Sequence, residues 1–137
     1  MNVFITTTRV RYAETDASGI VYYANYFIYF EVGRLEMFRA LGLPYDKRLP
    51  IADTYCRYLA SARFGDELEI HTSVDELRSC GFRLGHQVYR MTPGAEAELL
   101  VEGYTAMVTT DEEGRPTPLP PAFQRALTAP AERGEDP

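Results

Sequence analysis

The sequence predicts an α+β domain with five strands and one long helix. Segments with the residue alternation and composition of strands lie at residues 3–12, 51–62, 66–77, 82–91 and 97–109. A single apolar segment with helical character, residues 25–43, separates the first strand from the other four. Strands that follow a helix as a group, instead of alternating with helices, are typical of antiparallel α+β sheets and not of parallel nucleotide-binding sheets.

The length of the chain allows one domain of ordinary size. The chain has 137 residues, of which 45% are hydrophobic and 25% charged, and these values are typical of a globular protein with one core. We expect this domain to span residues 1–127 and to end in a short helix at residues 122–127, after a proline-rich segment. Residues 128–137 are predicted to form a flexible tail.

The predicted helix at residues 25–43 is apolar over most of its circumference. Gly42 and Pro44 are the stop signals at its end. Because apolar residues also occur away from the main apolar stripe, we expect the helix to be buried or nearly so. That stripe consists of Tyr26, Phe30, Gly33, Met37 and Leu41. Gly33 costs about 1 kcal/mol relative to alanine, which is tolerable if a sheet around the helix brings another backbone close to it.

Turn residues separate the last strands at spacings that suit hairpins. They occur at residues 79–81, 93–94 and 111–114. We therefore expect the four strands after the helix to form a meander. The clearest of these strands covers residues 66–77, where every second position is apolar or threonine. One face of this strand is therefore expected to contact solvent. The residues on the other face would be Leu68, Ile70, Thr72 and Val74.

The charge of the chain argues against nucleic acid as a partner. The net charge is −6, and the lysines and arginines form no dense basic run of the kind that binds a phosphate backbone. No apolar run reaches the roughly 20 residues of a membrane span, and residues 1–7 lack the pattern of a signal peptide. We therefore expect a cytoplasmic protein that binds neither nucleic acid nor membrane.

The cysteines and histidines do not form a metal or redox motif. Cys56 and Cys80 are far apart in the sequence and form no C-x-x-C pair. His71 and His86 each fall in a predicted strand and not in a cluster of ligands. We expect no metal site and no resident cofactor.

The connector between the first strand and the helix, residues 12–26, is longer than the connection requires. It carries a carboxylate, Asp16, then Gly19, and then enters the start of the helix, where unpaired N–H groups favour negative charge. A carboxylate opposite such donors could attack a thioester carbonyl, or activate water, and stabilise the oxygen charge that develops. Asp16 could equally cap a turn through its side chain, and Glu14 could simply lie in solvent. These residues alone leave both interpretations open.

Two motifs resemble a known family. The segment DASGIVYYANY, residues 16–26, is similar to the D-x-x-G-[IV]-V-[YW]-[YHF]-x-x-Y signature of the 4-hydroxybenzoyl-CoA thioesterase-like family, which includes the YbgC-like acyl-CoA thioesterases. The segment YLASARFGDELEI, residues 58–70, resembles the part of those proteins at the next strand junction. The resemblance extends over about residues 8–109.

The resemblance implies a hotdog fold, in which an antiparallel sheet wraps around the long helix. It also implies hydrolysis of a small acyl-CoA or aryl-CoA to the free acid and CoA, with no cofactor besides the CoA of the substrate. The active sites would lie at the interface of a homodimer, often in a dimer of dimers. Asp16 would be the essential carboxylate, as nucleophile or as base, and the backbone N–H of Tyr23 would polarise the thioester carbonyl.

Tyr23 occupies a position where many YbgC-like proteins have histidine. The hydroxybenzoyl-CoA branch has an aromatic residue there, as this chain does. A mechanism that uses an imidazole at this position is therefore excluded, whereas the role of the backbone N–H is unaffected. The remaining matching positions would contact the substrate; they are Gly19, Val21, Tyr22 and Tyr26.

The family places basic and small polar residues near the CoA phosphates, at the junction of the third and fourth strands. Arg78 and Ser79 match these positions, and Arg63 is a second candidate because guanidinium groups pair well with phosphate oxygens. Both arginines could also be ordinary surface residues. Since this stretch is less basic than in the hydroxybenzoyl-CoA branch, an acyl-carrier-protein thioester remains an alternative substrate.

Two other functions compete with hydrolysis. A hydroxyacyl dehydratase of the same fold would need a histidine near the helix entrance, which this sequence lacks. A non-catalytic acyl-CoA-binding module would not need Asp16. Glu31 and Arg34, three residues apart on the helix, are interpreted as an ion pair on the helix surface or at the dimer seam, and not as catalytic groups.

Overall fold

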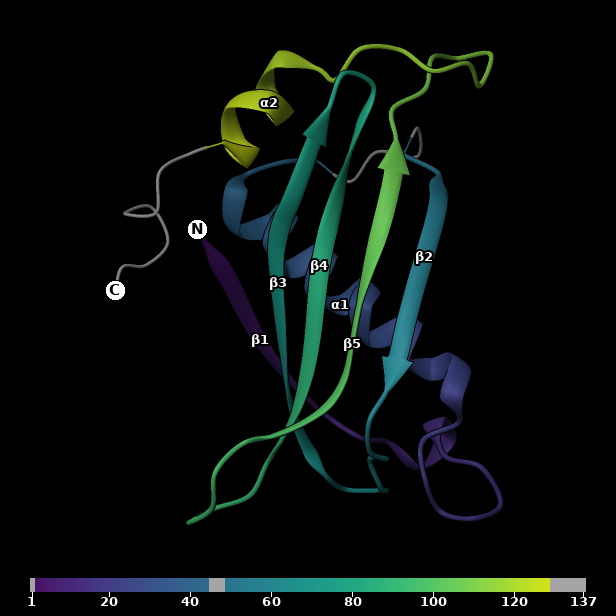
Figure 1. The fold of residues 1–137 in the computed structure, drawn as a ribbon, viewed down its shortest axis with the longest axis vertical. Helices are drawn as coiled ribbons and strands as arrows, with labels where there is room; N and C mark the ends of the chain where they lie inside the picture. Colours follow the sequence, from purple (N-terminus) through teal and green to yellow (C-terminus); the bar gives the residue numbers. More distant parts are fainter. Residues whose placement is uncertain (1, 45–48, 129–137) are drawn as a thin grey trace.

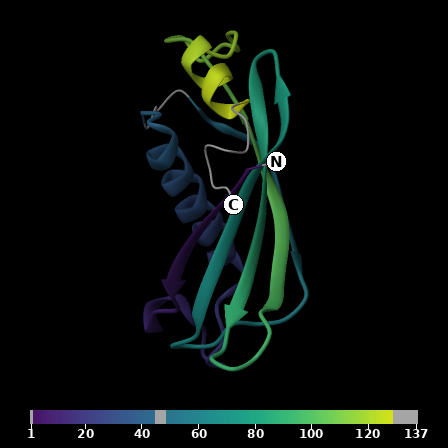
Figure 2. The same ribbon diagram turned by 90° about the vertical axis from the view of Figure 1, so that its left-hand side faces the viewer.

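The computed structural model describes residues 2–44 and 49–128. Its strands form one five-stranded antiparallel sheet in the order β1-β3-β4-β5-β2 (Figure 1). They are β1 (Val3–Arg9), β2 (Ile51–Tyr58), β3 (Glu67–Arg78), β4 (Gly81–Met91) and β5 (Glu98–Val108). The helix α1 (Tyr26–Leu41) lies along one face of this sheet, and the short helix α2 (Pro121–Leu127) lies at one end (Figure 2). The predicted hotdog architecture is confirmed.

The helix α1 buries one face and leaves the other partly exposed. It ends at Gly42, whose φ of 72° is the left-handed conformation that glycine adopts without strain. Ile28, on the opposite face, keeps 47% of its surface exposed. The prediction of a helix buried nearly all round is therefore wrong for the single chain, because the sheet covers only one side. The buried side consists of Tyr26, Tyr29, Phe30, Gly33, Arg34, Met37 and Phe38.

Gly33 marks the closest approach between α1 and the sheet. A Cβ at this position would lie 2.8 Å from Cγ2 of Ile70 and closer still to Oγ1 of Thr72. The predicted close contact is present, but side chains of β3 make it and not a backbone. Glycine is therefore needed at this position because there is no room for a Cβ, and not because of its backbone conformation.

The core has two parts along the length of α1. One part lies at the end of the sheet where β1 leads into the connector and is built on Tyr26, Phe30, Ile70 and Val88. The other lies near α2, whose Phe123 packs against Phe38 and Phe82, with ring centroids 5.8 and 6.4 Å apart.

The meander predicted for the last four strands is only partly correct. β3, β4 and β5 follow one another in the sheet, whereas β2 pairs with β5 at the far edge and not with β3. Residues 59–66, which link β2 to β3, form no tight hairpin turn and cross the end of the sheet. Turn chemistry predicted the local pairings, but the pairing of β2 depends on contacts distant in sequence.

The strands predicted at residues 3–12 and 51–62 end early, at Arg9 and Tyr58. The first ends because residues 12–14 form a 3₁₀ turn, η1 (Tyr12–Glu14). The tail predicted at residues 128–137 falls, except for Thr128, outside the described residues. Among the helices of residues 2–44 and 49–128, none is long and apolar enough to cross a membrane.

Candidate active site

The connector between β1 and α1 folds into a narrow loop between η1 and a second 3₁₀ turn, η2 (Tyr23–Asn25). Thr15 and Val21 form an antiparallel bridge across its base. Beyond this bridge, the N–H of Asp16 donates to the carbonyl of Ile20 at 2.8 Å, and the N–H of Gly19 donates to the carbonyl of Asp16 at 3.0 Å. Gly19 closes the turn with φ of 84°, a conformation that favours glycine.

Asp16 lies exposed at the tip of this loop. Its Oδ1 accepts a hydrogen bond from the N–H of Ser18 at 2.8 Å, which is the turn-capping interaction expected as one alternative. Within the described part of the chain, Oδ2 has no hydrogen-bond partner. One oxygen therefore orients the carboxylate while the other is available for chemistry.

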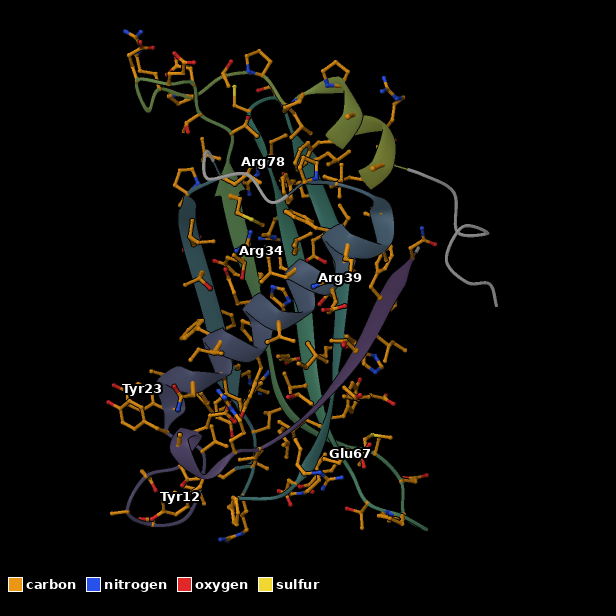
Figure 3. All side chains as sticks on the ribbon, turned by 180° about the vertical axis from the view of Figure 1, so that it is seen from behind. Tyr12, Tyr23, Arg34, Arg39, Glu67 and Arg78 are labelled. Carbon is orange, nitrogen blue, oxygen red and sulfur yellow. The ribbon has the colours of Figure 1, made fainter. Side chains whose placement is uncertain are left out.

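Tyr23 begins η2, immediately before α1. Its N–H has no acceptor among residues 2–44 and 49–128. The preceding N–H, that of Tyr22, donates to the carbonyl of Glu14 at 2.9 Å. Together with the Thr15–Val21 bridge, this bond brings η2 next to the loop that carries Asp16 (Figure 3).

Glu14 anchors the loop to the helix, and the interpretation that it lies in solvent is wrong. Its side chain is buried and accepts hydrogen bonds from the N–H and Nε of Arg11, both at 2.9 Å, and from Oη of Tyr29 at 2.8 Å. Its carbonyl also accepts from Nδ2 of Asn25 at 2.8 Å. Burial by itself raises the pKa of Glu14, but these donors and the charge of Arg11 outweigh it and lower the pKa below 4.5.

The two sequence motifs lie side by side in the structure. The carbonyl of Ala62 accepts from the N–H of Val21 at 2.9 Å, and the N–H of Ala62 donates to Oη of Tyr26 at 2.9 Å. Ile20 forms a bridge with Arg63. Arg63 is exposed beside the loop, so its predicted contact with a phosphate is sterically open.

The other predicted substrate contacts fall into two groups. Gly19 and Tyr22 are exposed, whereas Val21 and Tyr26 are only 3% and 2% exposed and support the loop from the core. Tyr22 packs against Tyr23 with ring centroids 4.9 Å apart, and this exposed aromatic pair lies at the entrance to α1.

Arg78 and Ser79 are not brought to the loop within one chain. Figure 3 shows Arg78 near α2, at the opposite end of the sheet from Tyr12 and Tyr23. Its guanidinium pairs with Glu76 at 3.0 Å. A site that contains both Asp16 and Arg78 would therefore need a second copy of the chain.

Neither histidine contacts the loop in any described interaction. His86 is buried, stacks on Phe30 with ring centroids 4.4 Å apart and bonds Oγ1 of Thr105 at 3.0 Å. Burial, and then the charge of Arg34, lower the pKa of His86 to about 3, so the ring is neutral. His71 pairs with Glu69 on the outer face of the sheet. The described residues contain no group of three or more potential metal ligands.

Glu31 and Arg34 form the predicted ion pair, but Arg34 is only 4% exposed and is not a surface residue. The Nε of Arg34 has no hydrogen-bond partner in the part of the chain that the structure describes. The described partners of this buried guanidinium are the half-exposed Glu31 carboxylate and the ring of Phe38, whose centroid lies 5.7 Å from its central carbon.

A hollow of about 370 Å³ on the outer face of the sheet is a poorer candidate for catalysis. Its acids are matched by cations, since Glu102 lies 3.5 Å from Arg57 and Asp75 lies 3.7 Å from Arg83. No oxyanion donor faces these acids in the described interactions. The loop with Asp16 remains the better site.

A five-stranded antiparallel sheet wrapped around one long helix is the hotdog fold. The chain belongs to the thioesterase-like superfamily, whose model matches residues 10–127. This membership confirms the family and the thioester hydrolase class inferred from the two motifs.

Named relatives agree with this assignment. The chain is 30% identical over 136 residues to a putative acyl-CoA thioesterase, YneP, of Bacillus subtilis, covering 94% of this chain and 96% of the relative. It is 30% identical to the acyl-CoA thioester hydrolase YbgC of Escherichia coli, covering 86% and 90%. The solved 4-hydroxybenzoyl-CoA thioesterase of a Pseudomonas species superposes with a TM-score of 0.81 at 25% identity, covering 92% of this chain and 99% of that one.

Proposed function

We propose that this chain hydrolyses the thioester bond of a small acyl-CoA or aryl-CoA and releases the free acid and CoA. The observation that carries the proposal is the pairing of an exposed carboxylate with an adjacent turn: among the described residues, one oxygen of the carboxylate and the first N–H of the turn have no hydrogen-bond partner. The names of the relatives, acyl-CoA thioesterases and a 4-hydroxybenzoyl-CoA thioesterase, support the choice of substrate class.

In the proposed mechanism, the N–H of Tyr23 donates to the thioester oxygen and stabilises its developing negative charge. Asp16 then attacks the carbonyl carbon to form an acyl anhydride that water hydrolyses, or it removes a proton from a water molecule that attacks directly. In either route the new C–O bond replaces the C–S bond. A thiol with a pKa of roughly 8.5 leaves as a thiolate without the help of a general acid, so the reaction does not need an imidazole at position 23.

The second copy of the chain would complete the site. β2 is an edge strand whose residues are mostly exposed, with Ile51, Tyr55 and Tyr58 each more than 40% exposed, and exposed sheet edges of this kind are liable to pair. Ile28, on α1, is a further exposed apolar residue. We propose a homodimer, alone or within a dimer of dimers, in which the partner supplies Arg78 and Ser79 to the CoA phosphates. A cytoplasmic location stays a prediction from the sequence.

The test is thiol release from a panel of short, long, branched and aromatic acyl-CoAs. Asp16→Asn should abolish turnover and leave the oligomer intact. Asp111→Asn is a matched control, because Oδ1 of Asp111 also caps an exposed turn by accepting the N–H of Glu113 at 2.9 Å. Full activity of Asp16→Asn would refute the mechanism.

The alternatives give different results in the same assay. An acyl-carrier-protein thioesterase would cleave the carrier-bound thioester much faster than the CoA ester of the same acid. A non-catalytic module would bind acyl-CoA, as measured by calorimetry, but would release no thiol. The wild type and Asp16→Asn would then behave alike.

A further inference from the structure

Tyr58, the last residue of β2, connects the sheet to the η2 turn. Its Oη donates a hydrogen bond to the carbonyl oxygen of Tyr23 at 3.0 Å. Its ring lies edge-on to the rings of Tyr23 and Tyr26, with centroids 6.2 and 5.6 Å apart. Nothing in the sequence motifs assigned a role to this hydroxyl.

We propose that Tyr58 is a positioning residue for thioester hydrolysis, and that its hydroxyl holds the η2 turn so that the N–H of Tyr23 is aimed at the thioester carbonyl. This inference rests on the proposed function. It adds a residue from a different element of the fold to the loop that carries Asp16.

The other described restraints on Tyr23 lie within the η2 turn and at its two ends. The two ends of η2 are fixed by bonds from the N–H of Tyr22 and from Nδ2 of Asn25 to the carbonyl of Glu14, at 2.9 and 2.8 Å. The side chain of Tyr23 itself is 62% exposed, so core packing does not hold it. The carbonyl of Tyr23 accepts the N–H of Tyr26 within the turn and, in addition, the hydroxyl of Tyr58, which among the described residues ties this backbone to the sheet.

A bond to this carbonyl restricts the backbone that presents the donor. The peptide unit is planar, so the bond from Tyr58 fixes the plane that follows Tyr23 and limits the ψ angle of that residue. The N–H of Tyr23 lies in the preceding plane, whose carbonyl, that of Tyr22, accepts from the N–H of Asn25 at 2.8 Å, so the two bonds together hold both peptide units that meet at Tyr23. Catalytic donors must be held close to their working geometry, and a small displacement reduces the rate. A hydroxyl at this point can thus influence the rate without touching the substrate.

The hydroxyl of Tyr58 is suited to donate and not to exchange protons. Burial, followed by the neighbouring Cys56 thiol, raises its pKa to about 12. At neutral pH the group stays protonated and keeps its bond to Tyr23. The proposed role is therefore positional and not acid–base.

The variant Tyr58→Phe tests the proposal, because it keeps the ring contacts and removes only the hydroxyl. One neutral hydrogen bond is worth about 0.5–1.5 kcal/mol, so kcat should fall roughly 2- to 13-fold, with KM changing less than about twofold. Tyr89→Phe is the control, since Tyr89 lies on β4, away from the loop and the β2 edge, and its hydroxyl makes a long, exposed bond to Gln87 at 3.3 Å. It should retain full kcat.

Amide hydrogen exchange provides a second readout that does not depend on turnover. Exchange at Tyr23 and Ala24 should be faster in Tyr58→Phe and unchanged in Tyr89→Phe, with the melting temperatures of both variants close to that of the wild type. An unchanged kcat in Tyr58→Phe, a loss confined to KM, or unchanged exchange would overturn the inference. If the wild type released no thiol from any substrate, the proposed function would fail first, which is a distinguishable result.

Discussion

The hydroxyl of Tyr29 donates to Oε1 of Glu14 at 2.8 Å, and both side chains are buried. Tyr29 lies on α1 and Glu14 in η1, so this bond ties the start of the Asp16 loop to the helix. The same carboxylate also accepts from the backbone and guanidinium of Arg11. Glu14 thereby holds the start of the loop in place and has no proposed contact with the substrate.

Tyr29→Phe should destabilise the protein by about 1–3 kcal/mol, because a buried carboxylate oxygen loses a donor that water cannot easily replace. Urea unfolding followed by circular dichroism measures this difference. Tyr89→Phe is the control: its hydroxyl makes a long, exposed bond to Gln87 at 3.3 Å, and its loss should change stability by less than about 0.5 kcal/mol. Equal effects of the two variants would contradict the role given to Glu14.

Stability should fall in acid partly through Glu14. Its pKa is lowered in the folded state from 4.5, so the unfolded chain binds this proton more readily. The contribution is fully present above pH 4.5 and is lost as the pH falls below that value through the folded-state pKa. Glu14→Gln should flatten this part of the curve of unfolding free energy against pH. A slope below pH 4.5 identical to that of the wild type would show that other carboxylates account for it.

The sequence predicted local features well and distant partners poorly. The end of α1 at Gly42 and the hairpins joining β3, β4 and β5 follow from turn chemistry within a few residues. The position of β2 in the sheet does not follow from turn chemistry, because its partner β5 lies far along the chain. The expected meander placed β2 beside β3. The pairing partner of β2 is set by tertiary contacts, which the local sequence pattern does not indicate.

The candidate site shows the same division. The capping bond of Asp16 to Ser18 spans two residues and was anticipated as an alternative. The burial of Glu14 depends on Tyr29, fifteen residues away, and the bond of Tyr58 to Tyr23 spans thirty-five, so no local pattern indicates either. The acid three residues after Arg11 matches only one half of a capping box, because arginine cannot accept the return bond, so this spacing does not indicate that Glu14 is buried.

His86 should make the free energy of unfolding depend on pH in a second range, separate from that of Glu14. Its pKa falls from 6.5 in the unfolded chain to about 3 in the fold, through burial and then the nearby charge of Arg34. Because only the unfolded state gains a proton in this range, stability is retained above pH 6.5 and declines below it, by about 2 kcal/mol between pH 7 and pH 5. The slope should disappear in His86→Gln and persist in His71→Gln, when unfolding free energies are measured across this range. If the slope persisted in both variants, groups other than His86 would account for it.

Gly33→Ala should destabilise the protein by about 1–3 kcal/mol, although alanine is the better helix former, because overpacking outweighs propensity. The new methyl group would meet Oγ1 of Thr72 and Cγ2 of Ile70. Adding Thr72→Ala should recover part of the loss, so that the double variant is more stable than the sum of the single effects predicts. Gly42→Ala is the control: it has open space but a φ of 72°, and Thr72→Ala should not rescue it. Strict additivity at Gly33 would show that the helix moves away from β3, and that the close approach is not a fixed part of the fold.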